Sequence, residues 1–351
     1  MAQLTNDDVS MSTQNTVTNS LGSSDIYLSE LTREIIIGVV YVVINPLFSV
    51  FGIITNLINI TVFIKCGFSD SVNIALLGLS LSDLFLLLFI LWRSICFFPL
   101  FRQADLPFDP LETAYVTAGI PLTYFGRTTS WITAFITLER FLCVAFPLKV
   151  KTLSTPRKST IIVICIYVLM AATVASLFYT SRVGMKFFPE RNSSRLGLVF
   201  TSDRYSVAKY ANPFSNLVVQ IGSFLFVLVF TVLLFDKLKS NNKWRQNVTD
   251  QASLLSRRDQ KVAIMIVLVS SNFIICYVGI TIEYIWPIFN PEFTSGLAYR
   301  NTLFVVTAFA ITTHQINAAT NLFIYLTMSS KYRRVFHSVF LCVTVKAGTS
   351  A

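Results

Sequence analysis

Seven long runs of apolar residues constrain the fold of this 351-residue chain more than any other feature. The runs cover residues 35–65, 72–100, 111–146, 159–181, 213–235, 261–289 and 302–328. A bilayer core of ~30 Å is crossed by roughly 20 helical residues, and every run reaches that length. Since lipid offers backbone groups no hydrogen-bonding partner, each run should be helical. The sequence therefore predicts an all-α bundle of seven transmembrane helices, and its low content of charged residues, 13%, excludes a soluble domain.

Basic residues indicate how the bundle is oriented. With the N-terminus outside the cell, sixteen Lys and Arg residues fall on the cytoplasmic side and nine on the outer side, the bias that the positive-inside rule describes. Membrane topology thereby accounts for the net charge of +10, and no nucleic-acid binding is expected. We expect a multi-pass protein of the plasma membrane with a cytoplasmic C-terminus.

The chain divides into three parts. Residues 1–34 are rich in Ser, Thr, Asn and Asp, lack the features of a signal peptide, and are expected to form a disordered extracellular tail. Residues 35–328 form the transmembrane domain, and residues 329–351 an interfacial helix and a short cytoplasmic tail. Asn192 begins an Asn-Ser-Ser tripeptide in the long outer loop, residues 182–212, and is a candidate for glycosylation.

Charged residues within the spans are costly and therefore indicate function. The strongest set is Glu139-Arg140-Phe141 at the inner end of the third span. Alone, these charges could be an interfacial anchor. They are accompanied by Asn56 in the first span, Asp83 in the second, Asn321 and Tyr325 in the seventh, and an amphipathic stretch at residues 331–336.

In order and spacing, this set resembles the rhodopsin-like (class A) G-protein-coupled receptor family over residues 35–342. Residues 139–141 are similar to the family's Asp-Arg-Tyr motif, and residues 321–325 to its Asn-Pro-x-x-Tyr motif with Leu322 in place of proline. Residues 331–336 resemble the family's short eighth helix, which makes Cys342 a candidate for palmitoylation. The stretch 132–151 is similar to invertebrate neuropeptide receptors and to related chemosensory receptors, and the sequence does not separate these two.

The resemblance implies a switch at the cytoplasmic face. In the family, the arginine matching Arg140 is held by its acidic neighbour, here Glu139, and by an acid at the base of the sixth helix, which Asp259 matches. Breaking these contacts lets the sixth helix swing outward and opens a cleft for a heterotrimeric G protein. Asp259 could instead simply offset its basic neighbours. The expected switch comprises Glu139, Arg140, Phe141, Asp259, Asn321 and Tyr325.

The resemblance also implies a buried polar cluster below the ligand site, which in the family can hold sodium. Such groups should satisfy one another through water, and a purely structural cluster is the alternative. Apart from a possible sodium ion at Asp83, no cofactor or metal is expected. The cluster's expected members are Asn56, Asp83, Thr129, Asn317 and Asn321.

Three departures place the chain in a divergent branch. The family usually ties the outer end of its third helix to the second outer loop by a disulfide, but Tyr115 stands at the matching position and residues 182–212 contain no Cys. The loop must therefore be held by packing alone or be mobile. In the sixth span, Tyr277 replaces the family's tryptophan and Gly279 its proline.

Single positions exclude two classes of ligand. Leu122 lies five helical turns before Arg140 and looks into the bundle, where amine receptors of the family carry an aspartate. A biogenic amine is therefore not expected. Gln315 stands where opsins carry the lysine that binds retinal, so the chain should not be a photoreceptor.

Polar and aromatic residues in the upper bundle suit a carboxylate-bearing small molecule or a short peptide. Arg127 is too deep to snorkel and needs a partner, whereas Arg93 lies near its helix end and could simply snorkel. His314 could be a packed hydrogen-bonding residue rather than a ligand contact. The candidate pocket residues are Arg93, Leu122, Tyr124, Arg127, Tyr277, Glu283, Tyr284 and His314.

The competing class is a transporter or channel in which Asp83, Arg127 and Glu283 line a polar path. Inverted repeats and rings of like charge, which would support it, are not found in the sequence. An enzyme is not expected, because His314 and His337 are far apart and no catalytic constellation appears.

Overall fold

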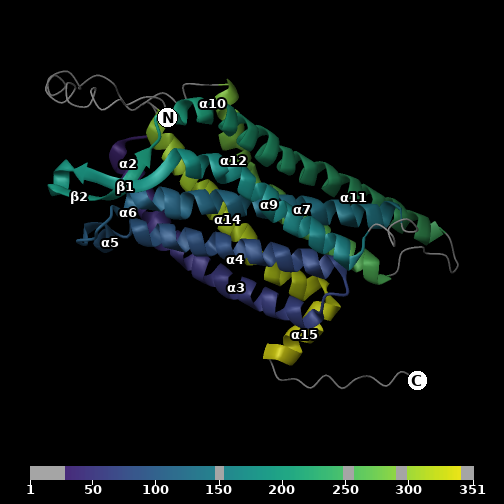
Figure 1. Cartoon of the computed structure of the whole chain (residues 1–351). Coiled ribbons are helices and arrows are strands. Elements are labelled where there is room, and N and C mark those ends of the chain that lie inside the picture. Colours follow the sequence, from purple (N-terminus) through teal and green to yellow (C-terminus); the bar gives the residue numbers. More distant parts are fainter. Residues whose placement is uncertain (1–27, 147–153, 248–256, 290–298, 341–351) are drawn as a thin grey trace.

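Seven long helical segments lie side by side in the computed structural model, which describes residues 28–146, 154–247, 257–289 and 299–340 (Figure 1). The segments are α2 (Glu30–Val39), η1 (Val40–Ile44) and α3 (Asn45–Cys66); α4 (Ser71–Phe97); α6 (Pro110–Ala114), η2 (Tyr115–Gly119) and α7 (Ile120–Ala145); α9 (Pro156–Thr180); α10 (Arg204–Pro213), η4 (Phe214–Ile221) and α11 (Gly222–Asn247); α12 (Arg257–Phe289); and α14 (Arg300–Met328). A short helix, α15 (Ser330–Phe340), follows the last of them. This confirms the predicted all-α bundle.

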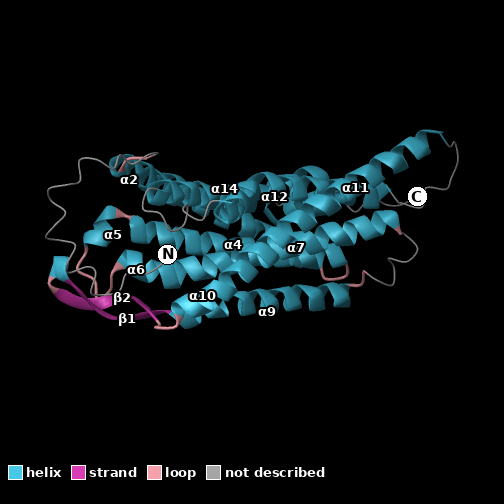
Figure 2. Ribbon diagram, turned by 90° about the horizontal axis from the view of Figure 1, so that it is seen from above, coloured by secondary structure: helices cyan, strands magenta, loops and turns pink. Residues whose placement is uncertain are grey.

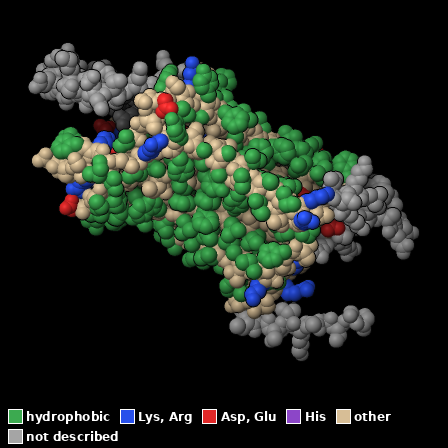
Figure 3. Space-filling model, in the orientation of Figure 1, with side chains coloured by type: hydrophobic (Ala, Val, Ile, Leu, Met, Phe, Trp, Pro, Cys, Tyr) green, Lys and Arg blue, Asp and Glu red, His purple; other side chains and the backbone are tan. Residues whose placement is uncertain are grey.

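Five of the seven segments are long and apolar enough to cross a membrane by length and composition. The other two, α7 and α14, are 26 and 29 residues long. They contain more polar residues, such as Thr129, Arg140 and Asn321, and these lie buried inside the bundle. Outward-facing positions are apolar, as Ile164 and Val168 on α9 illustrate. Hydrophobic side chains accordingly dominate the face in Figure 3, and Lys and Arg gather toward the two ends of the bundle.

Caps and turn residues set the helix boundaries. Ser29 accepts a hydrogen bond from the Thr32 amide at 3.2 Å, so that the first helix begins at Glu30. The prediction that the tail extends through residue 34 is therefore wrong at its end, and residues 1–27 lie outside the described part of the chain. Thr155 caps α9, whose first residue is Pro156, a position at which proline costs no hydrogen bond.

Close helix packing is seen most clearly at Gly52. A Cβ atom built on Gly52 would lie 2.8 Å from Leu87 Cδ1 and 3.3 Å from the Ala319 Cβ atom. Helices α3, α4 and α14 thus approach one another at a point where a side chain would not fit without displacement. The same region contains Asn56 and Asp83, so this packing positions the buried polar cluster.

A β-hairpin covers one end of the bundle in the outer loop between α9 and α10 (Figure 2). Its strands, β1 (Ser181–Phe188) and β2 (Ser193–Phe200), pair antiparallel, with Ser181 opposite Phe200 and Phe188 opposite Ser193. The one-turn helix η3 (Pro189–Arg191) and Asn192, in a left-handed conformation with φ 45°, form the turn. The candidate glycosylation residue Asn192 is therefore an exposed residue at the hairpin tip.

The hairpin is fastened to the segment that leads into α7. Backbone hydrogen bonds join Asp109 N to Leu196 O at 2.8 Å and Leu196 N to Pro107 O at 2.9 Å. The Glu112 carboxylate accepts from Lys186 Nζ and from the Leu198 amide, both at 2.8 Å. Arg195 pairs with Asp105 at 2.6 Å. The prediction that this loop is held by packing alone or is mobile is therefore wrong, because hydrogen bonds and ion pairs hold it at the place where the family usually has a disulfide.

Replacing Glu112 by Ala should loosen the hairpin without unfolding the bundle. The change removes an ion pair worth about 0–1 kcal/mol at this exposure and leaves the Leu198 amide without its acceptor, at about 1–3 kcal/mol. We expect hydrogen exchange of the hairpin amides to accelerate roughly tenfold, with little change in the melting temperature. Glu190→Ala, at the exposed hairpin tip, is the matched control; equal exchange in both variants would contradict the role of Glu112.

Candidate functional site

The inner end of α7 carries a buried ion pair. Arg140 and Glu139 are 8% and 6% exposed, and their side chains lie 3.6 Å apart. The Ser154 hydroxyl donates to the same Glu139 oxygen, Oε1, and lies 2.8 Å from the Ser71 hydroxyl. Glu139 is thus held directly by Arg140 of α7 and by Ser154, the residue before the α9 cap, and Ser71 at the start of α4 contacts Ser154. Sequence reasoning missed Ser154, since a serine in a loop gives no signal.

The other predicted switch residues lie on three helices: Phe141 on α7, Asp259 on α12, and Asn321 and Tyr325 on α14. Phe141 packs against Phe230 of α11, with ring centroids 5.5 Å apart. Asp259 lies exposed in the first turn of α12, and its pairing with Arg140 stays a prediction. Tyr325 is 1% exposed and packs edge-on against Phe63. Its hydroxyl has no hydrogen-bonding partner among the residues that the structure describes.

The buried carboxylate of Asp83 joins three helices. Thr129 donates to Asp83 Oδ1 at 2.8 Å, and the Asn321 side-chain amide donates to Oδ2 at 3.0 Å. Asn56 lies close by but donates to the backbone oxygens of Gly52 and Ala318, both at 2.9 Å, rather than to the carboxylate. In the described part of the chain, the side-chain oxygens of Asn56 and Asn321 are buried acceptors without a partner.

Asn317, predicted to belong to this cluster, contacts a different helix. Its side-chain oxygen accepts from Asn272 of α12 at 3.0 Å, and Asn272 also donates to Thr320 at 3.0 Å. Asn317 thus ties α14 to α12 through Asn272, and its expected place in the cluster around Asp83 stays a prediction. Asn272 is a further residue that sequence reasoning missed, although an amide in the middle of an apolar span was a visible signal.

Arg127 is the deepest cation in the upper bundle and is 3% exposed. It donates to Thr173 Oγ1 on α9 and to Asn216 Oδ1 on η4, both at 3.2 Å. No carboxylate of a described residue lies within 4.0 Å of it, and its Nε atom has no hydrogen-bonding partner there. Arg127 is therefore hydrogen-bonded to uncharged groups, and no described carboxylate balances its positive charge.

Tyr277 and His314 form a second set of unsatisfied groups. Their rings stack at 4.0 Å with an angle of 16°, and both residues are buried. Among the described residues, the Tyr277 hydroxyl and both His314 nitrogens have no hydrogen-bonding partner. A Cβ atom on Gly126 would come within 3.9 Å of His314, which places this pair beside α7. Buried polar groups almost always find partners, so these indicate a place for water or ligand.

The remaining pocket candidates are dispersed. Arg93 is half-buried and lies over the rings of Tyr41 and Phe97, at 5.1 and 5.8 Å. Glu283 accepts from Thr307 at 2.7 Å, and its Oε2 atom is buried without a partner among the described residues. These two residues lie on α4 and α12 in the upper bundle.

Three aromatic and apolar candidates serve packing. Leu122 is 8% exposed within an apolar cluster that includes Leu86. Tyr124 donates to the Tyr167 carbonyl of α9 at 3.2 Å and so turns toward that helix. Tyr284 packs at the edge of the cluster that contains Tyr277. Cys342 lies outside the described residues.

Comparison with known proteins places this geometry in context. The family described as serpentine type 7TM GPCR chemoreceptor Srw matches residues 43–343. The chain is 23% identical to the allatostatin-A receptor of Bombyx mori, with 91% of this chain and 84% of the relative covered. It is 21% identical to the galanin-like G-protein coupled receptor npr-9 of Caenorhabditis elegans, over 89% of this chain and 75% of that protein. It is 24% identical to the tachykinin-like peptides receptor 86C of Drosophila melanogaster, over 78% of this chain and 53% of that protein.

Proposed function

From the premise that the chain belongs to the serpentine chemoreceptor family Srw of seven-transmembrane G-protein-coupled receptors, we propose that it binds an extracellular ligand in the upper bundle and activates a heterotrimeric G protein. The observation that carries this proposal is the buried Glu139–Arg140 pair at the inner end of α7. A buried charge pair at the end of one helix has two discrete arrangements, closed and broken, and a ligand can bias one of them. The basic residues counted on the inner side support a plasma-membrane topology with the C-terminus in the cytoplasm.

The ligand we propose is a short peptide or a small chemosensory molecule. The names of the relatives point to peptides, whereas the family is described as one of chemoreceptors. The unsatisfied groups of Arg127, Tyr277 and His314 supply both a cation and neutral hydrogen-bonding groups on an aromatic wall. Such a set suits a ligand with an acidic group or several carbonyls next to an apolar part.

Asp83 is the proposed position of a sodium ion. A carboxylate and several neutral oxygens are the ligands that a hard cation prefers. Asp83 would hold the ion together with the Thr129 hydroxyl, and the unpartnered oxygens of Asn56 and Asn321 fit the same role. The ion would supply a positive charge that balances the buried carboxylate.

A nucleotide-exchange assay tests the proposed function. The purified chain in lipid vesicles is mixed with purified G proteins of several subtypes and screened with short amidated peptides and small organic acids. We expect at least one ligand to accelerate GTP-analogue binding several-fold. Solute or ion flux through the same vesicles without nucleotide exchange would favour a transporter or channel and overturn the proposal.

Replacing Ser154 by Ala should raise nucleotide exchange in the absence of ligand. Glu139 would lose a hydrogen bond from a neutral donor to a charge, worth about 1.5–3 kcal/mol, and would hold Arg140 less firmly. We expect basal exchange to rise roughly 3- to 10-fold at equal surface expression. Thr160→Ala removes a hydroxyl from an exposed position of α9 and should leave basal exchange unchanged. A lower melting temperature with unchanged basal exchange would show that Ser154 only supports the fold.

A further inference from the structure

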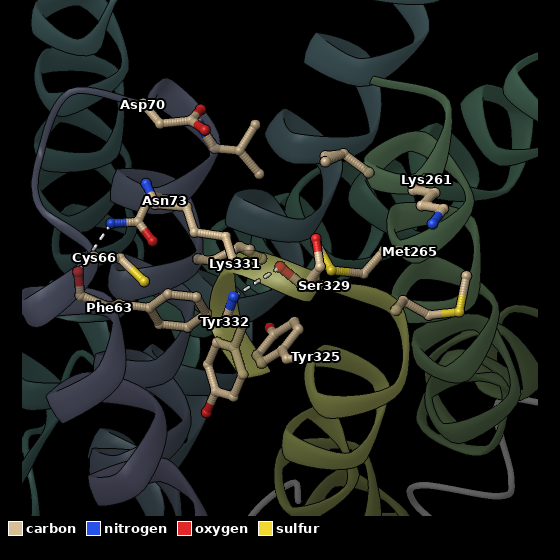
Figure 4. A pocket seen from close by; sticks show the side chains of 15 residues that line it. Phe63, Cys66, Asp70, Asn73, Lys261, Met265, Tyr325, Ser329, Lys331 and Tyr332 are labelled. Carbon is tan, nitrogen blue, oxygen red and sulfur yellow. Dashed lines mark hydrogen bonds between the residues drawn. The ribbon is translucent and has the colours of Figure 1, made fainter. Parts of the chain in front are cut away.

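A cavity of about 300 Å³ lies where the inner ends of α3, α4, α12, α14 and α15 meet (Figure 4). Much of its wall is apolar and is formed by Phe63, Leu76, Met265 and Met328. A volume of about 300 Å³ is at the lower end of the range seen for small-molecule sites. The cavity lies at the opposite end of the bundle from the outer hairpin and is separate from the proposed ligand pocket.

Two lysines from different helices line this cavity. Lys261 belongs to α12 and Lys331 to α15. Among the described residues, neither lysine has a carboxylate within 4.0 Å. A carboxylate of the wall, Asp70, caps α4 by accepting from the Val72 amide at 3.2 Å. It lies across the cavity from Lys261 in Figure 4, so that positive charges outnumber it two to one in the lining.

Further hydrogen-bond donors converge on the same space. Helix α15 begins here, and Ser329 accepts from the amides of Tyr332 and Arg333, at 3.2 and 3.0 Å. The amides of Ser330 and Lys331 precede the first intrahelical hydrogen bond, and the positive end of the helix favours an anion beside them. Independently, the buried Tyr325 hydroxyl lines the cavity and has no partner among the described residues.

We propose that this cavity binds an amphiphilic anion with a phosphate or carboxylate head group. Lys261, Lys331, the start of α15 and the Tyr325 hydroxyl take the oxygens of the head group, and the apolar wall takes the rest of the molecule. Bound in this way, the anion bridges α12 to α15. The proposed activation includes the outward swing of the sixth span, here α12, that the family resemblance implies. The anion therefore restrains the receptor in its resting state; this consequence, unlike the binding itself, rests on the proposed function.

Thermal unfolding of the full chain in nanodiscs tests the binding without any G protein. One arm adds hexyl phosphate, a soluble amphiphilic anion, to phosphatidylcholine nanodiscs, and the other incorporates phosphatidylinositol 4,5-bisphosphate into the nanodiscs. We expect the melting temperature to rise by several degrees in at least one arm. A rise in the first arm identifies a soluble anion as sufficient, and a rise confined to the second identifies a lipid head group.

Matched variants separate the cavity from general surface charge. The double variant Lys261→Gln, Lys331→Gln should lose the shift, corresponding to at least a tenfold weaker affinity, whereas Lys261→Arg, Lys331→Arg should keep it. Lys237→Gln, Arg334→Gln removes the same charge from exposed positions of α11 and α15 and should also keep it. No shift in either arm, or an equal loss in both glutamine double variants, overturns the proposal. Since a G protein is absent, failure here leaves the proposed signalling untouched, and failure of signalling leaves this binding intact.

Discussion

Replacing Arg140 by Ala should lower ligand-stimulated nucleotide exchange by at least about 30-fold, while the protein still reaches the membrane. The guanidinium lies buried at the inner end of α7, where it pairs with Glu139. In the open state that we propose, the same group is released from this pair and becomes available to the G protein. Its removal deletes a charge contact to the partner that is worth about 2–5 kcal/mol or more.

The control for this variant is Arg157→Ala, which removes an exposed cation from the first turn of α9 on the same side of the membrane. Surface expression by antibody labelling and exchange of GTP analogue are measured for both variants. Normal stimulated exchange in Arg140→Ala would refute the role of this residue. Loss of surface expression would instead show that the buried pair is needed for folding, and Arg140→Lys, which keeps the charge, would then decide the question.

The transmembrane spans were predictable because lipid offers backbone groups no hydrogen-bonding partner, so that a long apolar run must be helical. The polar motifs within them could be predicted from single residues, as at Arg140 and Asp83. Helix ends were less predictable, since α11 and α12 extend beyond the apolar runs at residues 213–235 and 261–289 into more polar sequence. Hydropathy measures only the part of a helix that contacts lipid, and a helix continues into water as long as its backbone bonds are favourable.

The outer hairpin was not predictable in the same way. Apolar residues alternate along both strands, at Val183, Met185 and Phe187 and at Leu196, Leu198 and Phe200. The contacts that fix the hairpin, from Glu112 and Asp105, are nevertheless distant in sequence. Because residues 182–212 contain no Cys, a disulfide within the chain could not fasten the loop. This absence could not indicate which carboxylates replace that link, because an exposed acid in a loop is indistinguishable from a solvated one.

The hydrogen-bonding partner of each buried polar residue could also not be predicted from the sequence. Asn317 and Asn321 lie on one helix, four residues apart, and both were expected near Asp83. Only Asn321 donates to the Asp83 carboxylate, because the side chain of Asn317 turns to α12 and accepts a hydrogen bond from Asn272. Helical spacing predicts the face on which a residue lies, but the identity of its partner depends on how the neighbouring helix is rotated.

Arg127 is expected to show opposite effects on stability and on ligand response, a combination that a merely structural residue would not give. A cation at the centre of a transmembrane helix costs about 2.5–3.5 kcal/mol on insertion scales. Replacing it by Met removes that cost and leaves the Asn216 oxygen without its donor, which costs about 1–3 kcal/mol. Arg127→Met should therefore keep or slightly raise the melting temperature.

The same change should weaken the response to an acidic ligand strongly. If the ligand's anion is the counter-charge that Arg127 lacks, its removal costs about 2–5 kcal/mol, which is a loss in potency of about 30-fold or more. Arg127→Lys retains the charge but lacks the planar guanidinium that contacts both Thr173 and Asn216. Its potency should therefore lie between those of the unchanged protein and Arg127→Met. Concentration–response curves for nucleotide exchange and thermal unfolding are measured on the same preparations.

The sign of the stability change decides between the two explanations of this arginine. If Arg127 were a structural tie between α7, α9 and η4, Arg127→Met would melt several degrees lower and the potency would follow the amount of folded protein. If it is kept for the ligand, stability and potency move apart. A buried cation held by neutral groups is unfavourable in the resting protein, and a site that is completed only when an anion enters is the physical reason to retain it.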